Sequence, residues 1–380
     1  MNAIVKVLRN VGSVAAWILT GGNIFKKRKE VIFPSGDNHS SFESGLYSRR
    51  EIIKNLAVVP VFGFLFWDMA RKHTGRNSFE EDQLSIKKGD SSEGASVTIR
   101  EKKVNDLQGN MPKGNIKELE ISRMIIGGNL ISGYAHSRDL VYVSDLVKEY
   151  HTDEKVIDTL FLCEECGINT AILRTDTDTV RVLDKYRKMG GKIQWIAQYY
   201  PAHDNMDNVN LAIDNGAAAA FSQGARADSF VSNKRVDVLH KSLEYIRSQG
   251  IPSGIGAHML EVPVTCEKEG LDPDFYMKTL HHYEFWSAPS KEDRSTIRLN
   301  NWSPETEETI DYMETLDKPW IAFKILAAGA IRAQEGLRYA FENGADFACI
   351  GMFDFQVVEN SKIISSLFQG DIPRNRPWRG

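Results

Sequence analysis

The feature that most constrains the fold is an order of elements that recurs through the C-terminal two thirds of the chain: a helical segment, a glycine and a short apolar run. The glycine stands between predicted helix and apolar run at Gly167, Gly191, Gly216, Gly250 and Gly344. Glycine at this place adopts the left-handed conformation that ends a helix, without a steric penalty. Repetition of this unit predicts a parallel sheet whose crossover connections are helices.

Eight apolar runs between residues 117 and 370 are the expected strands. They cover residues 121–126, 168–173, 193–197, 217–221, 251–257, 275–280, 320–325 and 347–350. Eight strand–helix units in roughly 250 residues have the size of a (β/α)8 TIM barrel. An open doubly wound sheet is the alternative, but no G-x-G-x-x-G pattern follows the first run. The sequence therefore predicts an α/β fold with a TIM barrel, whose chemistry lies where the strands end.

The N-terminal segment differs from the barrel in composition. Residues 48–54, SRREIIK, stand directly before the apolar run 55–67, NLAVVPVFGFLFW. A positive segment followed by about a dozen apolar residues has the layout of an export signal. The heptad resembles the twin-arginine signal, which implies a periplasmic protein, or a membrane-anchored one if residues 52–70 are retained. A buried or interfacial apolar helix is the alternative interpretation.

These patterns divide the chain into three parts. Residues 1–70 are the expected signal or membrane anchor, residues 71–116 an irregular linker rich in Lys, Glu, Ser and Gly, and residues 117–370 the TIM barrel. The net charge of -4 and the pI of about 6.2 show no basic surface, so nucleic acid is not an expected partner. Cys163 and Cys166 fall within a predicted helix and are interpreted as core residues rather than a redox or metal pair.

Polar side chains follow the predicted strands, where a barrel carries its active site. The residues expected to bind a small-molecule substrate are Asn129, His136, Arg138, Arg174, Asp176, Gln198, Tyr200, Gln223 and Trp286. The aromatic residues among and near them suit a sugar ring, which has an apolar face and hydroxyl edges. Packing of a lid or core explains the aromatic residues nearly as well.

Histidines at these strand ends are the candidates for proton transfer. His258 and His281 each directly follow an apolar run and are the stronger candidates, and His282 is adjacent to His281. A divalent metal is a possible cofactor, with ligands drawn from His203, His258, Glu261 and His281, although the spacing is not diagnostic. The alternative for each histidine is a residue of a surface loop.

Lys324 is expected late in the seventh strand. An inward lysine in a dry barrel has a depressed pKa and can act as a base or a Schiff-base nucleophile. Its alternative role is to pair with a carboxylate at the strand end. Ala328, Gly329 and Gly351 are expected to expose backbone that binds a phosphate or a cofactor, or else only to permit close helix packing.

Four stretches resemble the aldo-keto reductases. They are residues 121–133, ISRMIIGGNLISG, residues 152–173, TDEKVIDTLFLCEECGINTAIL, residues 323–329, FKILAAG, and residues 344–367, GADFACIGMFDFQVVENSKIISSL. The resemblance implies a TIM barrel and NADPH as cofactor. The family's catalytic Asp, Tyr, Lys and His do not carry over: Gln198 stands where the lysine is expected, and Gln223 stands where the histidine is expected.

Three functions follow from these patterns. The first is an exported enzyme with acid/base lyase, isomerase or hydrolase chemistry, with or without a metal ion, on a small sugar-like or polyol substrate. Its catalytic residues would be His258, His281, His282 and Lys324. The second is an NADPH-dependent oxidoreductase of the aldo-keto reductase kind. The third is a barrel that binds a sugar without catalysis.

Overall fold

The computed structural model describes residue 107 and residues 109–134, 140–202, 205–295 and 300–380. Eight parallel strands close into a barrel in the order β10-β3-β4-β5-β6-β7-β8-β9, which confirms the predicted fold. The strands are β3 (Met124–Gly127), β4 (Thr170–Arg174), β5 (Gln194–Tyr199), β6 (Ala219–Ser222), β7 (Ser253–Ala257), β8 (Phe275–Thr279), β9 (Trp320–Phe323) and β10 (Phe347–Ile350). Each lies within or beside its predicted apolar run.

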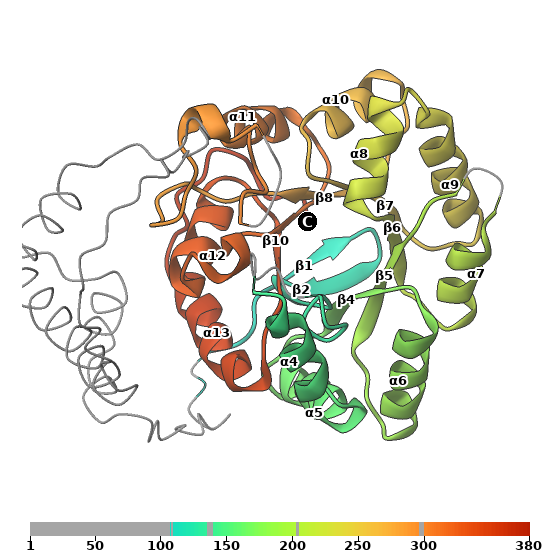
Figure 1. Cartoon of the computed structure of the whole chain (residues 1–380), viewed down its shortest axis with the longest axis vertical. Coiled ribbons are helices and arrows are strands. Elements are labelled where there is room, and N and C mark those ends of the chain that lie inside the picture. The colour runs from blue at the N-terminus through green and yellow to red at the C-terminus, as the bar shows by residue number, and fades with distance from the viewer. Residues whose placement is uncertain (1–106, 108, 135–139, 203–204, 296–299) are drawn as a thin grey trace, which may run out of the picture. The chain divides into compact units, whose positions relative to one another are not determined.

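Helices form a ring around the strands, as Figure 1 shows. They are α4 (Tyr142–Tyr150), α5 (Asp153–Glu165), α6 (Thr177–Lys188), α7 (Asp207–Asp214), α8 (Gly224–Ser232), α9 (Val236–Ser248), α10 (Glu261–Lys268), α11 (Thr306–Thr315), α12 (Ala333–Glu342) and α13 (Asp354–Leu367). Thr152 caps α5 as its sequence predicts, since its side chain accepts a hydrogen bond from the Lys155 amide. The sequence indicated loops where α4 and α8 lie.

Two apolar layers hold the barrel together. Alternate residues of each strand point inward, so Ile125, Ile172, Ile196, Phe275 and Ile321 fill the barrel interior. Their neighbours point outward and form a larger core against the helices. The four cysteines are free and buried, and Cys163 and Cys166 pack in this outer core, as interpreted from the sequence.

A hairpin covers the amino ends of the strands, which we call the bottom of the barrel. Its strands β1 (Lys113–Ile116) and β2 (Leu119–Ser122) pair antiparallel, and Ile116 and Ile121 join the interior core. The hairpin lies across the centre of the helical ring in Figure 1. Residues 113–116 were expected to be linker, because a four-residue strand shows too little alternation to be recognised.

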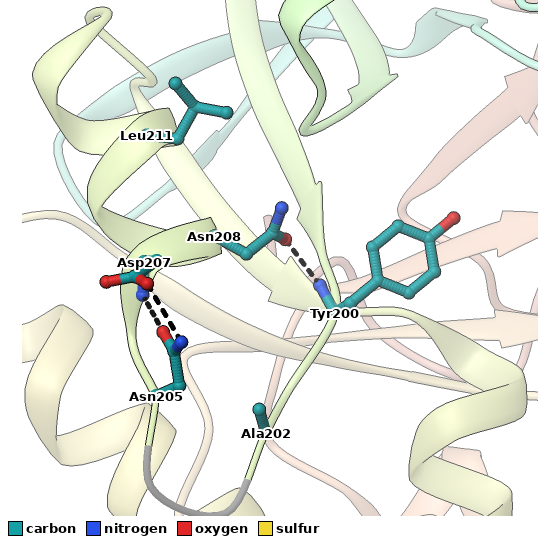
Figure 2. A pocket seen from close by; sticks show the side chains of 6 residues that line it. All are labelled: Tyr200, Ala202, Asn205, Asp207, Asn208 and Leu211. Atoms are coloured by element: carbon teal, nitrogen blue, oxygen red, sulfur yellow. Dashed lines mark hydrogen bonds between the residues drawn. The ribbon is translucent and has the colours of Figure 1, made fainter.

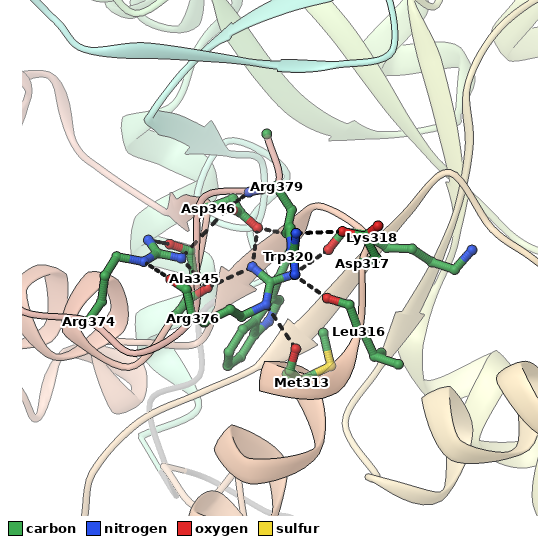
Figure 3. Close-up of polar contacts among 12 residues, drawn as sticks. Met313, Leu316, Asp317, Lys318, Trp320, Ala345, Asp346, Arg374, Arg376 and Arg379 are labelled. Carbon is green, nitrogen blue, oxygen red and sulfur yellow. Dashed lines mark hydrogen bonds and ion pairs between the residues drawn. The ribbon is translucent and has the colours of Figure 1, made fainter.

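The C-terminal tail also packs on the bottom of the barrel. Arg376 inserts between α11 and β10, where it donates to the carbonyls of Met313 and Leu316 and to the Asp346 carboxylate (Figure 3). The Arg123 guanidinium donates to the carbonyl of Gly380 over 2.8 Å. The tail is therefore part of the barrel's closure.

The predicted signal and anchor lie outside the described residues, because the description begins at residue 107. Export and membrane attachment through residues 52–70 therefore stay predictions. Among the helices that the structure describes, none has the length and apolar character needed to cross a membrane.

Candidate active site

A cavity of about 400 Å³ lies at the carboxyl ends of the strands, which we call the mouth of the barrel. Its walls come from β3, β4, β5, β8, β9 and β10 and from helices α4 and α13. Seven of the residues predicted to bind substrate, cofactor or protons line it: Asn129, Arg174, Gln198, Lys324, Ala328, Gly329 and Gly351. The mouth cavity therefore brings together seven of the described candidates, which come from several different strands.

Strand alternation explains why two of these polar residues face the cavity. Ile172 and Ile196 point into the barrel, so Arg174 and Gln198, two residues further along the same strands, point to the same side. The two residues are also register partners across β4 and β5. A guanidinium and an amide thus lie side by side at the mouth.

Lys324 corrects one expectation from the sequence. It lies one residue beyond β9 rather than within it, and its φ of 60° is in the left-handed region. The lysine that does lie within a barrel strand is Lys278, in β8. The apolar run continued through Ile325, so composition gave no sign that the strand ends at Phe323.

The Lys324 amine is held against an aromatic ring at the mouth. Nζ lies 3.9 Å from the centroid of Trp302. The residue is half-buried, yet protein surrounds the amine closely enough that burial lowers the pKa of Lys324 to about 7. Cation–π attraction favours the charged amine, but burial is the larger effect. Near neutral pH this amine can therefore both accept and donate a proton.

The loop after Lys324 has an unusual backbone. Ala327 and Ala328 adopt φ values of 44° and 57°, and Gly329 follows with 90°. Left-handed conformation costs a residue with a side chain energy, and such strain is concentrated at functional sites. Ala328 and Gly329 line the mouth cavity, so the strained backbone faces the site.

Arg174 is fixed by aromatic rings. Its guanidinium lies 4.3 Å from the ring centroid of Tyr134 and 5.5 Å from that of Tyr200. The Asp176 carboxylate is 3.7 Å from Nε, which is too long for a hydrogen bond. A guanidinium held in this way presents a fork of donors that suits a carboxylate or phosphate.

His258 is clamped by a carboxylate from α8. Asp228 accepts hydrogen bonds from His258 Nδ1 over 2.7 Å, from the His258 amide over 3.0 Å and from the Met259 amide over 3.1 Å. The ring packs 5.3 Å from Trp302 and 5.4 Å from Phe323, which lines the mouth cavity. Because Asp228 engages Nδ1, Nε2 is the nitrogen left to exchange a proton.

Lys278 supports His258 from the outer side of β8. This fully buried lysine donates to the His258 carbonyl over 2.8 Å and to Thr279 Oγ1 over 3.0 Å. Burial lowers the pKa of Lys278 to about 8, and the carboxylates of Asp228 and Glu305 oppose that effect. Asp228 and Lys278 are the functional candidates that the sequence did not single out.

His281 and His282 do not line the mouth cavity. His281 is fully buried, with Nε2 accepting from the Trp302 amide over 2.9 Å and Nδ1 donating to the His282 carbonyl. Burial lowers the pKa of His281 to about 4. His282 packs against Tyr339 of α12. A catalytic role for either stays a prediction that this arrangement does not favour, because His281 holds Trp302 in place instead.

Other predicted residues have separate positions. Asp176 and Gln223 cap α6 and α8, and Glu261 begins α10. Tyr200 lines a shallow surface depression beside α7 (Figure 2). Trp286 is 69% exposed. His136, Arg138 and His203 lie outside the described residues.

The predicted metal site involves His203, His258, Glu261 and His281. Within residues 107, 109–134, 140–202, 205–295 and 300–380, no group of three or more His, Cys, Asp or Glu is arranged to hold a metal ion. The predicted set included His203, which lies outside these ranges.

Comparison with known proteins gives fold likeness alone. No protein-family model matches the chain, and no curated protein matches its sequence. Solved structures with a similar barrel include a putative aldo-keto reductase from Pseudomonas aeruginosa, with 15% identity, a TM-score of 0.47, and coverage of 70% of this chain and 98% of that one.

Two synthases are similarly distant. A truncated 3-deoxy-D-arabino-heptulosonate 7-phosphate synthase from Thermotoga maritima has 11% identity and a TM-score of 0.43, covering 68% of this chain and 92% of that one. An N-acetylneuraminic acid synthetase from Leptospira borgpetersenii has 10% identity and a TM-score of 0.40, covering 71% and 94%. The likeness is one of general barrel architecture, so function must be argued from the site.

Proposed function

We propose that this barrel is an enzyme that performs acid/base chemistry, of the lyase, isomerase or hydrolase kind, on a small sugar-like substrate with an anionic group. One observation carries the proposal: the Lys324 amine and the Asp228-bound His258 both pack on Trp302 at the mouth of the barrel. Two groups that can exchange protons thus share one side of the mouth.

Lys324 is the proposed base. Its amine is neutral in part at pH 7, because burial lowers its pKa, and a neutral amine can remove a proton next to a carbonyl group. The same amine can form a Schiff base with that carbonyl, which releases water and makes the adjacent proton more acidic.

His258 is the proposed second proton carrier. A hydrogen bond from Nδ1 to Asp228 leaves Nε2 as the acceptor and stabilises the ring when it becomes protonated. A pair of groups allows one to remove a proton while the other donates a proton to the substrate oxygen.

Arg174, Gln198 and Asn129 are the proposed substrate-binding residues. Arg174 supplies paired donors for a carboxylate or phosphate, and Gln198 supplies an amide for a hydroxyl group. A cavity of about 400 Å³ has the size of small-molecule sites.

Solvent deuterium exchange tests this function. The full-length protein is incubated in D2O with a panel of sugar phosphates and sugar acids, and deuterium next to the carbonyl is measured by mass spectrometry. We expect exchange that Lys324→Met reduces about 100-fold to 10,000-fold, the range of general base catalysis. Lys188→Met, on the exposed surface of α6, is the matched control. Equal exchange in the Lys324→Met and wild-type proteins would reject Lys324 as the base.

A nicotinamide-dependent reductase is the second candidate. The observation that favours it is the strained loop containing Ala328 and Gly329, which lines the cavity together with Gly351 and Tyr134, a possible proton donor. Saturable quenching or enhancement of NADPH fluorescence by the full-length protein would support this candidate, and its absence would retire it. Binding of a sugar with neither exchange nor reduction would identify a non-catalytic barrel.

Export is proposed on the heptad at residues 48–54 alone. A twin-arginine route would place the barrel in the periplasm, or on the membrane if residues 52–70 are retained. Fractionation of cells that make the Arg49→Lys, Arg50→Lys double variant tests the route. Unchanged distribution of the protein would reject it.

A further inference from the structure

One side of the mouth cavity is apolar, and that surface continues out of the cavity. Val143 and Val147 of α4 and Phe353 beside α13 line the cavity. Arg174, Gln198 and Lys324 line the same cavity and provide polar groups. The cavity therefore offers an apolar surface as well as polar groups.

Helix α4 is apolar on its outer face as well. Tyr142 and Leu146 lie one helical turn apart, so they share a face, and each is 61% exposed. Val141 directly before the helix is 83% exposed. A surface helix normally turns charged residues to water, so exposed apolar groups beside an apolar-walled cavity indicate a binding surface.

Two aromatic residues connect the outer surface to the cavity. Tyr134 lines the cavity and is 52% exposed. Phe355 is 53% exposed, and its ring stacks on that of Phe353 with centroids 5.3 Å apart and an interplanar angle of 6°. We call Tyr134, Val141, Tyr142, Leu146 and Phe355 the apolar rim.

Polar contacts behind the rim hold its two sides in place. Tyr150, at the end of α4, donates to Asp354 Oδ1 at the start of α13 over 2.5 Å. Lys155 donates to the other oxygen of Asp354 over 2.9 Å. Burial and the bond to Asp354 raise the pKa of Tyr150 to about 12, so this contact persists at neutral pH. The apolar wall between α4 and α13 is thus preformed.

We propose that the substrate is amphiphilic, with an anionic, sugar-like head in the mouth cavity and an apolar chain that leaves it along the apolar rim. This inference rests on the proposed function, since it places the head at Arg174 and Lys324. The chain would cover Val143 and Val147 inside the cavity and Tyr142, Leu146 and Phe355 outside it. Covering these residues removes apolar surface from water on both partners.

Calorimetric titration of the full-length protein with inorganic phosphate and with butyl, octyl and dodecyl phosphate, below their micelle concentrations, tests the inference. We expect affinity to rise about fourfold for each methylene group that the rim covers. Leu146→Ser and Tyr142→Ser should each weaken the binding of octyl phosphate about fivefold and leave the binding of butyl phosphate unchanged. Met189→Ser, a change at an equally exposed apolar residue beyond α6, is the matched control and should have no effect.

The outcomes separate this inference from the proposed function. The apolar rim is rejected as a binding surface if affinity is independent of chain length. It is also rejected if Met189→Ser and Leu146→Ser lose the same affinity for octyl phosphate. Suppose that Arg174→Met abolishes the binding of inorganic phosphate while chain length has no effect on affinity. The proposed head site is then supported and the apolar rim is rejected as a binding surface. Suppose instead that affinity rises with chain length but Arg174→Met leaves the affinity unchanged. The apolar rim is then supported as a binding surface and the proposed head site is rejected.

Discussion

The two ends of the barrel treat charged side chains in opposite ways. At the bottom, the fully buried Asp346 carboxylate accepts hydrogen bonds from the Trp320 amide, the Arg379 amide and Arg376 Nη1. Arg376 donates from its three nitrogens to five oxygens, four of them backbone carbonyls that include those of Met313 and Leu316 (Figure 3). The charges of Asp346 and Arg376 are thus matched by partners within the chain itself.

The mouth of the barrel leaves its charges incompletely matched. Lys324 faces an aromatic ring rather than a carboxylate, and Arg174 Nε is buried without a hydrogen bond. Buried polar groups without partners lower stability, so a fold keeps them where a ligand completes them. The comparison teaches that the bottom serves closure of the barrel and the mouth serves binding and chemistry.

The largest expected effect on stability comes from removing the Arg376 side chain at the bottom of the barrel. Arg376→Ala leaves the Asp346 carboxylate buried with one strong partner fewer and several carbonyls unsatisfied. Removal of one member of a buried ion pair costs about 3–5 kcal/mol. We expect a loss of this size in the free energy of unfolding, measured by chemical denaturation.

A matched change nearby sharpens this expectation. The Arg379 side chain pairs over 2.7 Å with Asp317, which is 83% exposed. Exposed pairs contribute about 0–1 kcal/mol, so Asp317→Ala should cost little. Equal losses in Asp317→Ala and Arg376→Ala would contradict the structural role assigned to the buried cluster.

A smaller effect is expected when the support of His258 is removed. Asp228→Asn keeps the size of the side chain but replaces one carboxylate oxygen with an amide NH2 group, which cannot accept a hydrogen bond from His258 Nδ1. We expect kcat in the exchange assay to fall about tenfold to 100-fold with little change in KM, because a supporting hydrogen bond to histidine has effects of this order. Glu305→Gln, which alters the acceptor of the Leu260 amide, is the control. A change in KM alone would assign Asp228 to substrate binding instead.

The smallest expected effect is a gain in stability at the mouth. Burial lowers the pKa of Lys324 from 10.5 to about 7, so the unfolded chain binds more protons between these values. Wild-type stability therefore rises with pH across this window. Lys324→Met lacks the buried amine and should melt about 2–4 °C higher at pH 6.5, with a gain that shrinks towards pH 10. A lower melting temperature at pH 6.5 would show that the amine stabilises the fold.

The sequence predicted the barrel because its strands are continuous apolar runs separated by helices and glycines. Strand boundaries were less predictable, since strands buried on both faces lack alternation. The direction of Lys278 was not predictable either, although it lies within the predicted run 275–280: its position in β8 turns it outward beneath the helices, where it bonds to the His258 carbonyl. Helix α4 was missed because the polar residues 136–139 just upstream of it indicated a long loop.

The site was predicted in part. Arg174 and Gln198 were found because they directly follow the predicted apolar runs, and Asn129 because it stands three residues after the first run. Asp228 could not be found, since it lies in a helix distant in sequence from His258, and only the closed barrel brings the two together. His281 follows β8 by two residues, so strand alternation no longer determined its direction.

The measurement that tests the central claim most directly is the pH dependence of lysine reactivity. Trace acetylation of the full-length protein from pH 5 to 11, with the extent at Lys324 measured by mass spectrometry against a lysine-containing reference peptide, gives the titration of the amine. The account predicts a midpoint near pH 7 for Lys324, against about 10.4 for the peptide. A Lys324 midpoint near that of the peptide would contradict it, because the amine would then be charged at neutral pH and could not act as the base.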